Sequence, residues 1–415
     1  MSETVGRPDW LTAPQTAAVM DALERAGGTD CARFVGGCVR NAVLGEPVGD
    51  LDIATLLPPE AVIAALKAAR LKAIPTGVEH GTVTALSEGR TYEITTLRRD
   101  IETDGRRAVV AFTTDWVEDA GRRDFTLNAL YATRDGVVLD PLGRGLEDAR
   151  AGRIVFVGEA QARIREDYLR ILRFFRFLAW YGRGGPDSAA VAACAALKGG
   201  ISTLAAERVS AEILKLLNAA DPRAAVALMD ETGVLGAALP EVGDRSRFDA
   251  LVRQETELLF AGDALLRLAA LLSPDVEAAR AAATRLRLSN AQRDRVSAAQ
   301  GTTPPLAAAM TPRDVRRAVY LLGAKVFADR ARLAWAAETD TAATPDWRAI
   351  LAQAASWTAP MFPVGGEAAA AAGLPRGPKL GQVLRALEAW WVDADFPDDT
   401  AALQARLTEL AAAAK

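Results

Sequence analysis

The 415-residue sequence contains a single histidine, His80, and only three cysteines, Cys31, Cys38 and Cys194. One histidine excludes zinc sites built on several histidines and the paired-histidine sites of phosphohydrolases. The cysteines lack the spacing of metal ligands, and a chain of this length does not depend on a disulfide framework. We therefore expect small buried thiols in a reducing compartment and a structural role for His80.

Long apolar runs are also absent. No stretch reaches the roughly 18 apolar residues that a membrane-spanning helix needs, and the N-terminal segment MSETVGRPDW lacks the pattern of a signal peptide. We expect a cytoplasmic protein without membrane contact, and no sequence feature indicates a protein partner. The formal net charge is −4, so the chain has no overall basic excess for binding nucleic acid, although local charge can differ from the sum.

The apolar pattern divides the chain into a mixed α+β part and a helical remainder. Alternating runs predict strands at 33–35, 51–55, 81–86, 92–97 and 137–139, and helical spacing predicts helices at 14–27, 38–44, 58–71 and 124–131. Residues 98–110, rich in Arg and Asp, predict a mobile loop. From about residue 159 onward the pattern is helical only, with breaks near 182–187, 240–246 and 357–378.

Two glycines, a helix and a pair of aspartates form the first candidate site. The strand before Gly36 and Gly37 ends where missing side chains let the backbone approach a bulky anion. The following helix directs its amide groups at that anion, with Arg40 in its first turn. Asp50 and Asp52 lie two apart on a predicted strand, so both carboxylates share a face and can hold Mg²⁺ against a triphosphate.

The Asp-x-Asp spacing alone is a weak signal. It recurs at Asp393 and Asp395, where no glycine pair precedes it, and there we expect a chance occurrence. The glycines and the helix before Asp50 and Asp52 are what distinguish that pair.

The segment RRDFTLNAL, residues 122–130, is a second candidate site. Arginines directly before a predicted helix, followed by Asp124 and Thr126, suit the phosphates and sugar hydroxyls of a nucleotide. Taken alone, the segment is explained better by helix capping through Asp124 or Thr126 and by solvated arginines.

A predicted helix at 161–181, QARIREDYLRILRFFRFLAWY, is the third candidate site. Apolar residues surround it on nearly all sides, which indicates burial. Asp167, Arg170, Arg173 and Arg176 nevertheless recur at every third position, and buried guanidinium groups need partners. Only Glu166 and Asp167 lie close in sequence, so the missing negative charge favours a bound anionic ligand; a network of carboxylates from elsewhere in the chain is the alternative.

Taken in order, these segments resemble the tRNA nucleotidyltransferase and poly(A) polymerase family, in its bacterial and eukaryotic branch (class II). The resemblance extends from about Phe34 to Glu241 and includes GGCVRN…DLD, EITTLRRD, RRDFTLNAL, DPLGRGLEDARAG, EDYLRILRFFRF and ISTLAAERVSAEILKLL…ETGVLGAALPEV. It implies a polymerase-beta-like α+β nucleotidyltransferase head (1–157) followed by an all-α neck (158–240), body (241–356) and tail (357–415). Asn41 departs from the family, which usually has Asp there; the departure concerns a contact near the triphosphate rather than the metal pair.

The resemblance also implies a template-independent RNA nucleotidyltransferase that adds CMP and AMP, from CTP and ATP, to the 3′ end of tRNA. In that picture Asp50 and Asp52 are catalytic and hold two Mg²⁺ ions, one at the RNA 3′-hydroxyl and one at the triphosphate. Glu93 is a candidate third carboxylate, because YEITTL predicts a neighbouring strand. The implied nucleotide-binding residues are Gly36, Gly37, Arg40, Arg123, Asp124, Asn128, Asp167, Arg170, Arg173 and Arg176.

The chemistry of Asp167 and Arg170 suggests how the base is chosen. Cytosine and adenine present an amino donor beside an unprotonated ring nitrogen, whereas uracil and guanine present a carbonyl beside a ring N–H. On one helix, Asp167 would accept from the amino group and Arg170 would donate to the ring nitrogen, with Arg173 and Arg176 holding both in place.

Several alternatives stay open. A poly(A) polymerase shares all these motifs, although PTGVEHGTVTAL at 75–86 resembles the form seen in CCA-adding enzymes. Enzymes that add only C or only A are not excluded, and residues 98–110 are expected to help the pocket switch from C to A. The retained Asp50 and Asp52 disfavour a catalytically inactive RNA-binding protein, and the long helical part disfavours a nucleotidyltransferase acting on small molecules.

Overall fold

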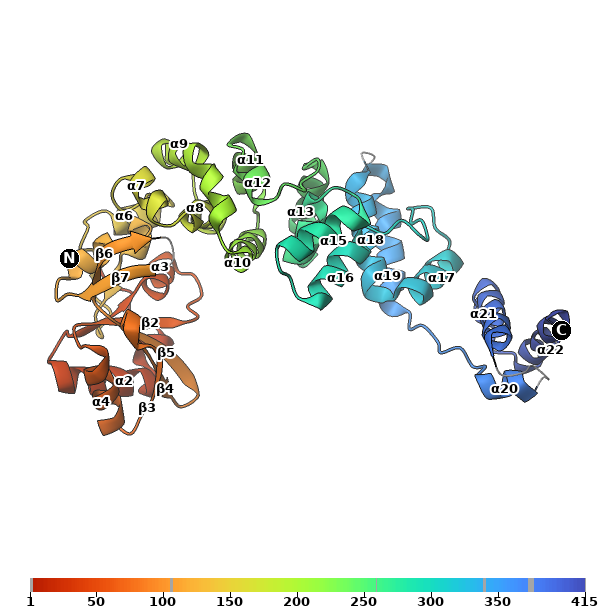
Figure 1. The fold of residues 1–415 in the computed structure, drawn as a ribbon, viewed down its shortest axis with the longest axis horizontal. Helices are drawn as coiled ribbons and strands as arrows, with labels where there is room; N and C mark the ends of the chain where they lie inside the picture. The colour runs from red at the N-terminus through yellow and green to blue at the C-terminus, as the bar shows by residue number, and fades with distance from the viewer. Residues whose placement is uncertain (1–2, 105–106, 259, 339–340, 372–376, 415) are drawn as a thin grey trace. The chain divides into compact units, whose positions relative to one another are not determined.

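Figure 1 shows the computed structural model, which describes residues 3–104, 107–258, 260–338, 341–371 and 377–414. They form two compact units, Met1–Pro240 and Glu241–Lys415. Every named strand of the described chain belongs to the first unit, and helices account for the regular structure of the second. The predicted fold class, an α+β head followed by helices, is confirmed.

Within the described residues, no helix combines the length and the apolar character needed to cross a lipid bilayer.

A seven-stranded sheet forms the centre of the head. Its strands lie in the order β3 (Lys72–Gly77), β4 (Thr82–Ser87), β5 (Arg90–Thr96), β2 (Leu51–Thr55), β1 (Ala32–Val35), β8 (Tyr131–Ala132) and β9 (Val138–Leu139). Neighbouring strands are antiparallel except β2 and β5, which are parallel and place Asp52 beside Glu93. The five predicted strands are thereby confirmed. β3 was not predicted, because it is a largely exposed edge strand that contains Pro75 and lacks an apolar alternation.

The two faces of this sheet have different surroundings. On one face, Thr16 of α2 (Pro14–Gly27) makes a 3.0 Å hydrogen bond to the hydroxyl of Tyr92, and α4 (Pro59–Ala68) packs against β3, β4 and β5. Side chains alternate along a strand, so Glu93 and its neighbour Asp52 point to the opposite face. That face also receives Tyr131, Ala54 and Val35, which share a buried cluster.

Several shorter elements complete the head. These are α1 (Asp9–Thr12), α3 (Gly37–Leu44), η1 (Val78–His80), α5 (Trp116–Gly121), η2 (Thr126–Asn128) and α6 (Gly145–Ala151). The helices predicted at 14–27, 38–44 and 58–71 are confirmed. The helix predicted at 124–131 is wrong: a 3₁₀ turn is followed directly by β8, because Tyr131 pairs with Val35 of β1 and this long-range pairing overrides the local pattern.

The loop predicted at 98–110 is also wrong. β6 (Arg98–Asp104) and β7 (Arg107–Phe112) form an antiparallel hairpin with Arg98 opposite Phe112, and residues 105–106 lie outside the described chain. The β-branched residues of RAVVAF favour a strand. The two strands pair with each other, so their backbone groups form hydrogen bonds within the hairpin and the strands do not join the seven-stranded sheet.

Seven further helical elements complete the first unit: α7 (Ala160–Glu166), α8 (Leu169–Tyr181), α9 (Ser188–Leu197), η3 (Lys198–Thr203), α10 (Ala206–Leu217), α11 (Arg223–Glu231) and α12 (Val234–Ala238). The single helix predicted at 161–181 is wrong, because the chain is extended at Asp167 (φ −154°, ψ 105°) and separates α7 from α8. The Asp167 side chain accepts a hydrogen bond from the Leu169 amide at 3.1 Å, which satisfies a donor at the start of α8.

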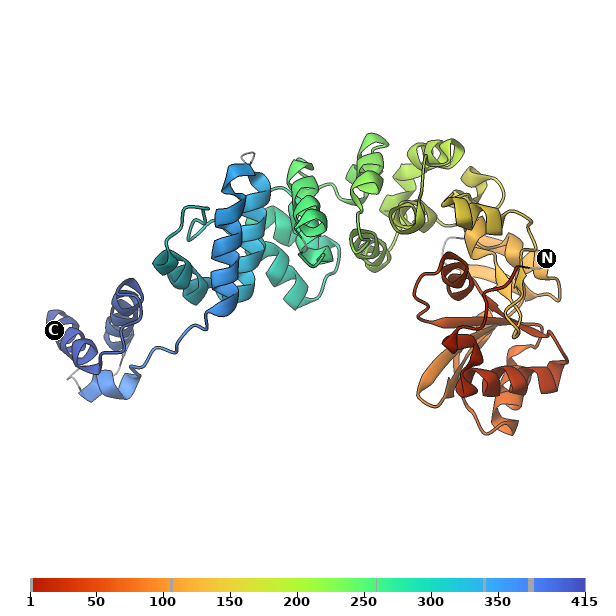
Figure 2. The same cartoon turned by 180° about the vertical axis from the view of Figure 1, so that it is seen from behind.

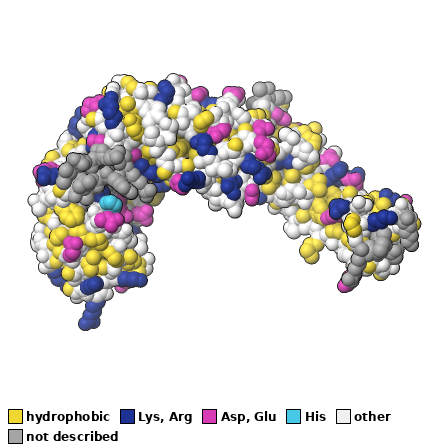
Figure 3. Space-filling view, in the orientation of Figure 1, with side chains coloured by type: hydrophobic (Ala, Val, Ile, Leu, Met, Phe, Trp, Pro, Cys, Tyr) yellow, Lys and Arg dark blue, Asp and Glu magenta, His cyan; other side chains and the backbone are white. Residues whose placement is uncertain are grey.

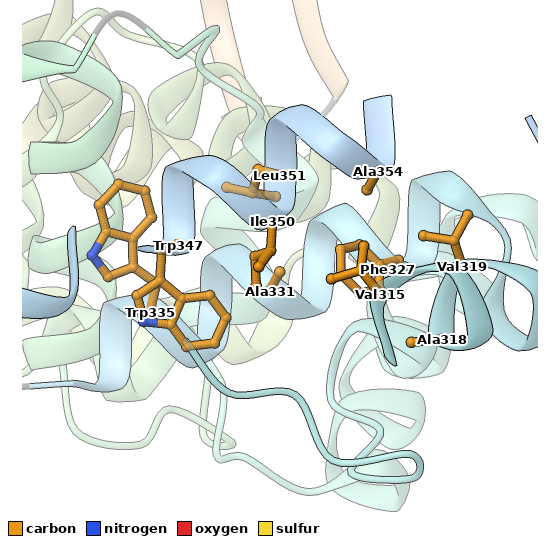
Figure 4. Packing of buried hydrophobic residues seen from close by; sticks show 10 residues of the cluster. All are labelled: Val315, Ala318, Val319, Phe327, Ala331, Trp335, Trp347, Ile350, Leu351 and Ala354. Atoms are coloured by element: carbon orange, nitrogen blue, oxygen red, sulfur yellow. The ribbon is translucent and has the colours of Figure 1, made fainter. Parts of the chain in front are cut away.

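Two of the buried clusters in the described part of the second unit lie among its later helices. Its helices are α13 (Ser246–Glu257), α14 (Ala264–Leu271), α15 (Val276–Arg285), α16 (Asn290–Ala299), α17 (Pro312–Leu322), α18 (Ala324–Ala337), η4 (Thr341–Ala343), α19 (Thr344–Ser356), α20 (Gly366–Ala371), α21 (Pro378–Asp393) and α22 (Thr400–Ala413). Phe327, Trp335 and Trp347 pack among α17, α18 and α19 (Figure 4). Leu387, Trp391 and other side chains of α20, α21 and α22 form the second cluster. Figure 2 shows the same helices from behind, with an extended connection before α20. Residues 372–376 of the break predicted at 357–378 lie outside the described chain.

Candidate functional site

β2 and β5 bring acidic side chains together on one face of the head sheet. Asp52 and Glu93 are register partners, and Asp50 lies immediately before β2. Burial, followed by the charge of Glu93, raises the pKa of Asp52 to about 6; Asp50 acts in the same direction and Arg123 opposes it. Carboxylates that disfavour one another's charge suit a divalent cation, which offsets the repulsion. Among the described residues, no three potential metal-ligating side chains are close enough together to bind one metal ion. Asp50 and Asp52 are therefore the candidate ligand pair, and Glu93 is their neighbour.

The glycine pair lets two guanidinium groups lie close to the start of α3. Gly36 has φ +71° and ψ −121°, a conformation that side chains rarely adopt, and a Cβ atom there would lie 3.4 Å from Nη1 of Arg123. Gly37 begins α3, and a Cβ atom there would lie 3.8 Å from Nη2 of Arg40. The absent side chains therefore keep both guanidinium groups close to the amides at the start of α3.

Arg40 is buried, with only 7% of its surface exposed, and neutral groups hold its guanidinium. It donates to Oδ1 of Asn128 at 2.5 Å, to Oδ1 of Asn41 at 2.8 Å and to the hydroxyl of Tyr181 at 2.8 Å, and it lies 4.1 Å above the Tyr181 ring. Burial lowers its pKa. Among the described residues no carboxylate lies within ion-pair distance of Arg40, so its positive charge is available to an anion. Asn41, the departure from the family pattern, is thus a direct contact of Arg40.

Arg123 is positioned by a carboxylate that the sequence analysis missed. Asp119, in the first turn of α5, pairs with Arg123 at 3.1 Å and with Arg122 at 2.8 Å, and it accepts a hydrogen bond from the Tyr131 hydroxyl at 2.6 Å. Burial by itself raises the pKa of Asp119, but the two arginines and the hydroxyl outweigh burial and lower it. The i,i+3 and i,i+4 spacing of Asp119 to the two arginines is the signal that could have revealed it.

Asp124 connects the head to α8. Its Oδ1 accepts hydrogen bonds from the Asn128 side chain and the Phe125 amide, both at 2.9 Å, and its Oδ2 accepts from Nε of Arg173 at 2.7 Å. Because Asn128 also binds Arg40, a continuous hydrogen-bonded chain runs from α3 through Asn128 and Asp124 to α8. The predicted residues of the first two candidate sites therefore meet those of the third.

The arginines of α8 have carboxylate partners within the chain. Arg170 pairs with Glu166, Arg173 with Asp124, and Arg176 with Glu212 of α10 at 2.7 Å. Of the two explanations that the sequence left open, carboxylates from elsewhere are the one observed, and the expected shortage of negative charge is wrong. Glu212 lies 36 residues after Arg176 in the sequence (212 − 176), so no local pattern indicates this pairing.

Asp167 does not share a helix with Arg170 and does not pair with it. Its Oδ2 accepts from Arg208 of α10 at 2.7 Å, while Nη1 of Arg170 donates to the Arg163 carbonyl at 2.6 Å and to Glu166. The two side chains predicted to read the base are thus held by Arg208 and Glu166. Glu166 is one of the two nearby carboxylates that the sequence offered as partners, whereas Arg208 was not predicted.

The other Asp-x-Asp sequence lies in the second unit, where it is engaged in ion pairs. Asp393 lies 3.0 Å from Arg317, and Asp395 accepts from Nε of Arg316 at 2.8 Å.

Basic and acidic side chains are interspersed on the face shown in Figure 3. On that face the charges do not segregate into one uniform basic surface.

Two families match parts of the chain. The family described as "Poly A polymerase head domain" matches residues 32–155, which include the glycine pair, the aspartates and Asp124. The family described as "Probable RNA and SrmB- binding site of polymerase A" matches residues 186–244.

Individual proteins are similar to this chain over different lengths. The CCA-adding enzyme of Streptococcus sanguinis is 33% identical over 399 residues, covering 94% of this chain and 96% of that protein. The human mitochondrial CCA tRNA nucleotidyltransferase 1 is 42% identical over 191 residues, covering 45% of this chain and 43% of the human protein. Several curated relatives are likewise matched over only about half of their own length.

A solved structure is similar over nearly the whole chain. The crystal structure of the Bacillus stearothermophilus CCA-adding enzyme in complex with CTP superposes with a TM-score of 0.76 and 27% identity. It covers 96% of this chain and 98% of that one.

Proposed function

Since this chain belongs to the family of CCA-adding enzymes, we propose that it is a CCA tRNA nucleotidyltransferase that adds CMP and AMP, from CTP and ATP, to the 3′ end of tRNA without a template. The observation that carries the proposal is the continuous hydrogen-bonded chain from Arg40 through Asn128 and Asp124 to Arg173. It joins the candidate catalytic face of the head to α8, which contains Arg170 and begins shortly after Asp167.

Asp50 and Asp52 are proposed as catalytic metal ligands. The family uses a divalent metal ion, and we assign Mg²⁺ here because paired carboxylates suit a hard cation. When bound, such ions activate the RNA 3′-hydroxyl and neutralise charge on the triphosphate. The raised pKa of Asp52 fits this role, because a cation would remove the cost of holding the carboxylates together.

The residues around the aspartates are proposed to bind the nucleotide. Gly36 and Gly37 leave room for the triphosphate at the amides of α3, and Arg40 and Arg123 supply positive charge. Asp124 and Asn128 are proposed to contact the ribose and to fix Arg173. Arg173 and Arg176 then act by holding α8 in position.

Asp167 and Arg170 are proposed to select the base from the positions that the structure gives them. A carboxylate oxygen accepts more than one hydrogen bond, so Asp167 can bind an exocyclic amino group while it stays paired with Arg208. Among the described residues the hydrogen bonds of Arg170 use only Nη1, which leaves Nε and Nη2 to donate to a ring nitrogen. Cytosine and adenine match this pair of groups, whereas uracil and guanine do not.

We also propose the division into head (1–157), neck (158–240), body (241–356) and tail (357–415), with tRNA as the partner. The division into compact units at Pro240 and Glu241 supports the boundary between neck and body. A cytoplasmic location is proposed as well, because Cys31, Cys38 and Cys194 are free and buried, as is usual in a reducing compartment.

The decisive experiment supplies purified protein with tRNA that lacks CCA, together with CTP, ATP, both or neither, and resolves products at single-nucleotide resolution. We expect addition of C alone with CTP, completion of CCA with both nucleotides, and no addition to this RNA with ATP alone. A long A tract with ATP alone would instead identify a poly(A) polymerase, the second candidate given the description of the head family. Products that stop before the final A would identify an enzyme that adds only C.

A tRNA that already ends in CC completes the design. A CCA-adding enzyme and an enzyme that adds only A both extend it with ATP, but only the former also acts on the RNA without CC.

A further inference from the structure

The C-terminal end of α8 and the neighbouring α10 border a pocket next to the site described above, and Trp180 and Lys215 of its lining have no role in that site. Arg176, Phe177, Trp180 and Tyr181 line it from α8, and Lys215 lines it from α10. Trp180 is 46% exposed and is the only tryptophan or tyrosine among the large exposed hydrophobic side chains of the described chain. An aromatic face that stays in water on a well-packed unit is a candidate surface for a planar ligand.

The walls of this pocket, which we name the Trp180 pocket, are fixed before any ligand binds. The Trp180 indole N–H donates to the Lys215 carbonyl at 2.8 Å, which sets the direction of the ring. Tyr181 is held through its hydroxyl by Arg40 at 2.8 Å, and the two rings lie 6.4 Å apart. A ligand that stacks on Trp180 therefore loses little free energy to ordering of the protein.

Positive charge borders the aromatic surface. The exposed Lys215 has no carboxylate within ion-pair distance among the described residues, whereas Arg176, which lies 4.4 Å from the Phe177 ring, is paired with Glu212. An exposed aromatic face beside cations is the combination that binds single-stranded nucleic acid, with a base stacked on the ring and a phosphate near the cation. The pocket also adjoins Arg40 through Tyr181, so an occupant would lie next to the nucleotide-binding residues of α3.

We propose that the Trp180 pocket binds an unpaired nucleotide near the 3′ end of the RNA that is being extended, with its base stacked on Trp180 and its phosphate near Lys215. This inference rests on the proposed function. An incoming nucleotide has to be discriminated, which requires hydrogen-bonding groups such as Asp167 and Arg170. The end of the growing RNA presents a different base after each addition, and stacking accepts every base because every base has an aromatic face.

The test uses a hairpin that copies a tRNA acceptor arm, with the fluorescent base 2-aminopurine placed in turn at each unpaired 3′ position, and no nucleotide present. Binding to the wild-type protein should quench the fluorescence at one position. Trp180→Phe, which keeps an aromatic face but loses the indole N–H, should retain most of the quenching. Trp180→Ala should lose the quenching and weaken binding about 5- to 100-fold. Lys215→Ala should weaken binding and reduce its salt dependence, whereas Lys67→Ala, an exposed lysine on α4, should not.

A substrate change separates stacking from a structural role of Trp180. Replacing the quenched base by an abasic site should weaken binding to the wild-type protein as much as Trp180→Ala does, and the two changes together should cost no more than either alone. Fully additive losses would overturn the proposal, as would a rise in KM for CTP with unchanged RNA binding. If the wild-type protein adds no nucleotide to tRNA that lacks CCA, the proposed function fails. The fluorescence measurement still decides whether the pocket binds RNA.

Discussion

At the scale of single residues, the candidate site residues could be predicted from the sequence, but the ion-pair partners that hold them could not. The glycine pair and the aspartates two apart constrain local geometry, and the structure places Asp52 beside Glu93 with Asp50 directly before β2. Asp119, Arg208 and Glu212 were missed, although each holds a predicted residue in position. The reason is physical: the partner of a buried arginine is chosen by tertiary contact, and a charged residue on a helix looks the same in sequence whether it is solvated or paired.

The same limit applies to the two Asp-x-Asp sequences. Asp50 and Asp52 follow a glycine pair that Arg123 and Arg40 approach closely, and neither aspartate has an ion-pair partner among the described residues, whereas Asp393 and Asp395 are neutralised by arginines of α17. The spacing is identical in both places. What differs is whether the carboxylates have cationic partners in the folded chain.

The first prediction concerns the aspartates. Asp50→Ala and Asp52→Ala should each reduce nucleotide addition to below about a tenth of the wild-type rate at saturating Mg²⁺, since one oxygen ligand of a divalent ion is lost in each case. tRNA binding should change little, because carboxylates do not attract the phosphates of RNA. Mg²⁺ should also raise the Tm of the wild-type protein more than that of Asp52→Asn, because only the wild-type protein has repulsion for the ion to relieve. Asp393→Ala is the matched control and should keep full activity.

The second prediction tests base selection through Asp167. In Asp167→Ala the pocket loses the acceptor for an amino group and the charge that repels a carbonyl, so discrimination between CTP and UTP should fall by about one to two decades, the equivalent of about 1.5–3 kcal/mol. kcat/KM is measured for CTP, ATP, UTP and GTP on one tRNA. Arg208→Ala keeps the Asp167 carboxylate but removes the ion pair that positions it, so we expect a smaller loss of discrimination. An unchanged ratio of CTP to UTP in Asp167→Ala would show that this residue serves only as an ion-pair partner.

At the scale of helices and strands, the predictions succeeded where one face was apolar and failed where long-range contacts decide. α2 and α4 have apolar stripes that pack on the sheet, and both were predicted. The break between α7 and α8 was not, because RIREDYLR contains neither Gly nor Pro and only the capping bond of Asp167 interrupts the helix. That break has a functional consequence, since it turns Asp167 toward α10 and away from Arg170.

The third prediction follows from α10. Glu212 is buried and neutralises Arg176, so Glu212→Ala leaves a largely buried guanidinium without its partner. We expect a loss of about 2–3 kcal/mol, below the usual cost of breaking a fully buried pair because Arg176 is partly exposed, and a fall in Tm of several degrees. Glu231→Ala, at the exposed end of α11, is the control and should change the Tm little. Equal melting temperatures for the Glu212 and Glu231 variants would contradict the anchoring role of α10.

At the scale of the whole molecule, the net charge of −4 and the interspersed charges of Figure 3 give no simple indication of an RNA partner. The relation to CCA-adding enzymes provides that indication, and the local arrangement explains it. Arg40 and Lys215 are cations without a carboxylate partner among the described residues, whereas the nearby Arg123, Arg173 and Arg176 are paired. A protein can thus be acidic overall and still present positive charge where a phosphate binds, because pairing neutralises some of its arginines and leaves others available. The order of head and helices could be predicted from the sequence, whereas this selective pairing could not.

The last prediction concerns how the molecule recognises tRNA. The acceptor arm is duplex RNA, and its deep, narrow major groove cannot be read by side chains, so binding should depend on backbone and shape. Phosphate contacts release counterions, and the logarithm of the association constant should therefore fall linearly with the logarithm of salt concentration. We expect the affinity, measured by fluorescence anisotropy between about 50 and 200 mM KCl, to fall at least tenfold for each of several unrelated tRNAs, with only a few-fold difference among them at any one salt concentration. An acceptor-arm hairpin of scrambled sequence is the control, because it keeps the A-form shape and should bind with the same salt dependence as the natural arm. A strong preference for one tRNA species, maintained across the salt range, would show that base edges are read and that shape alone does not account for recognition.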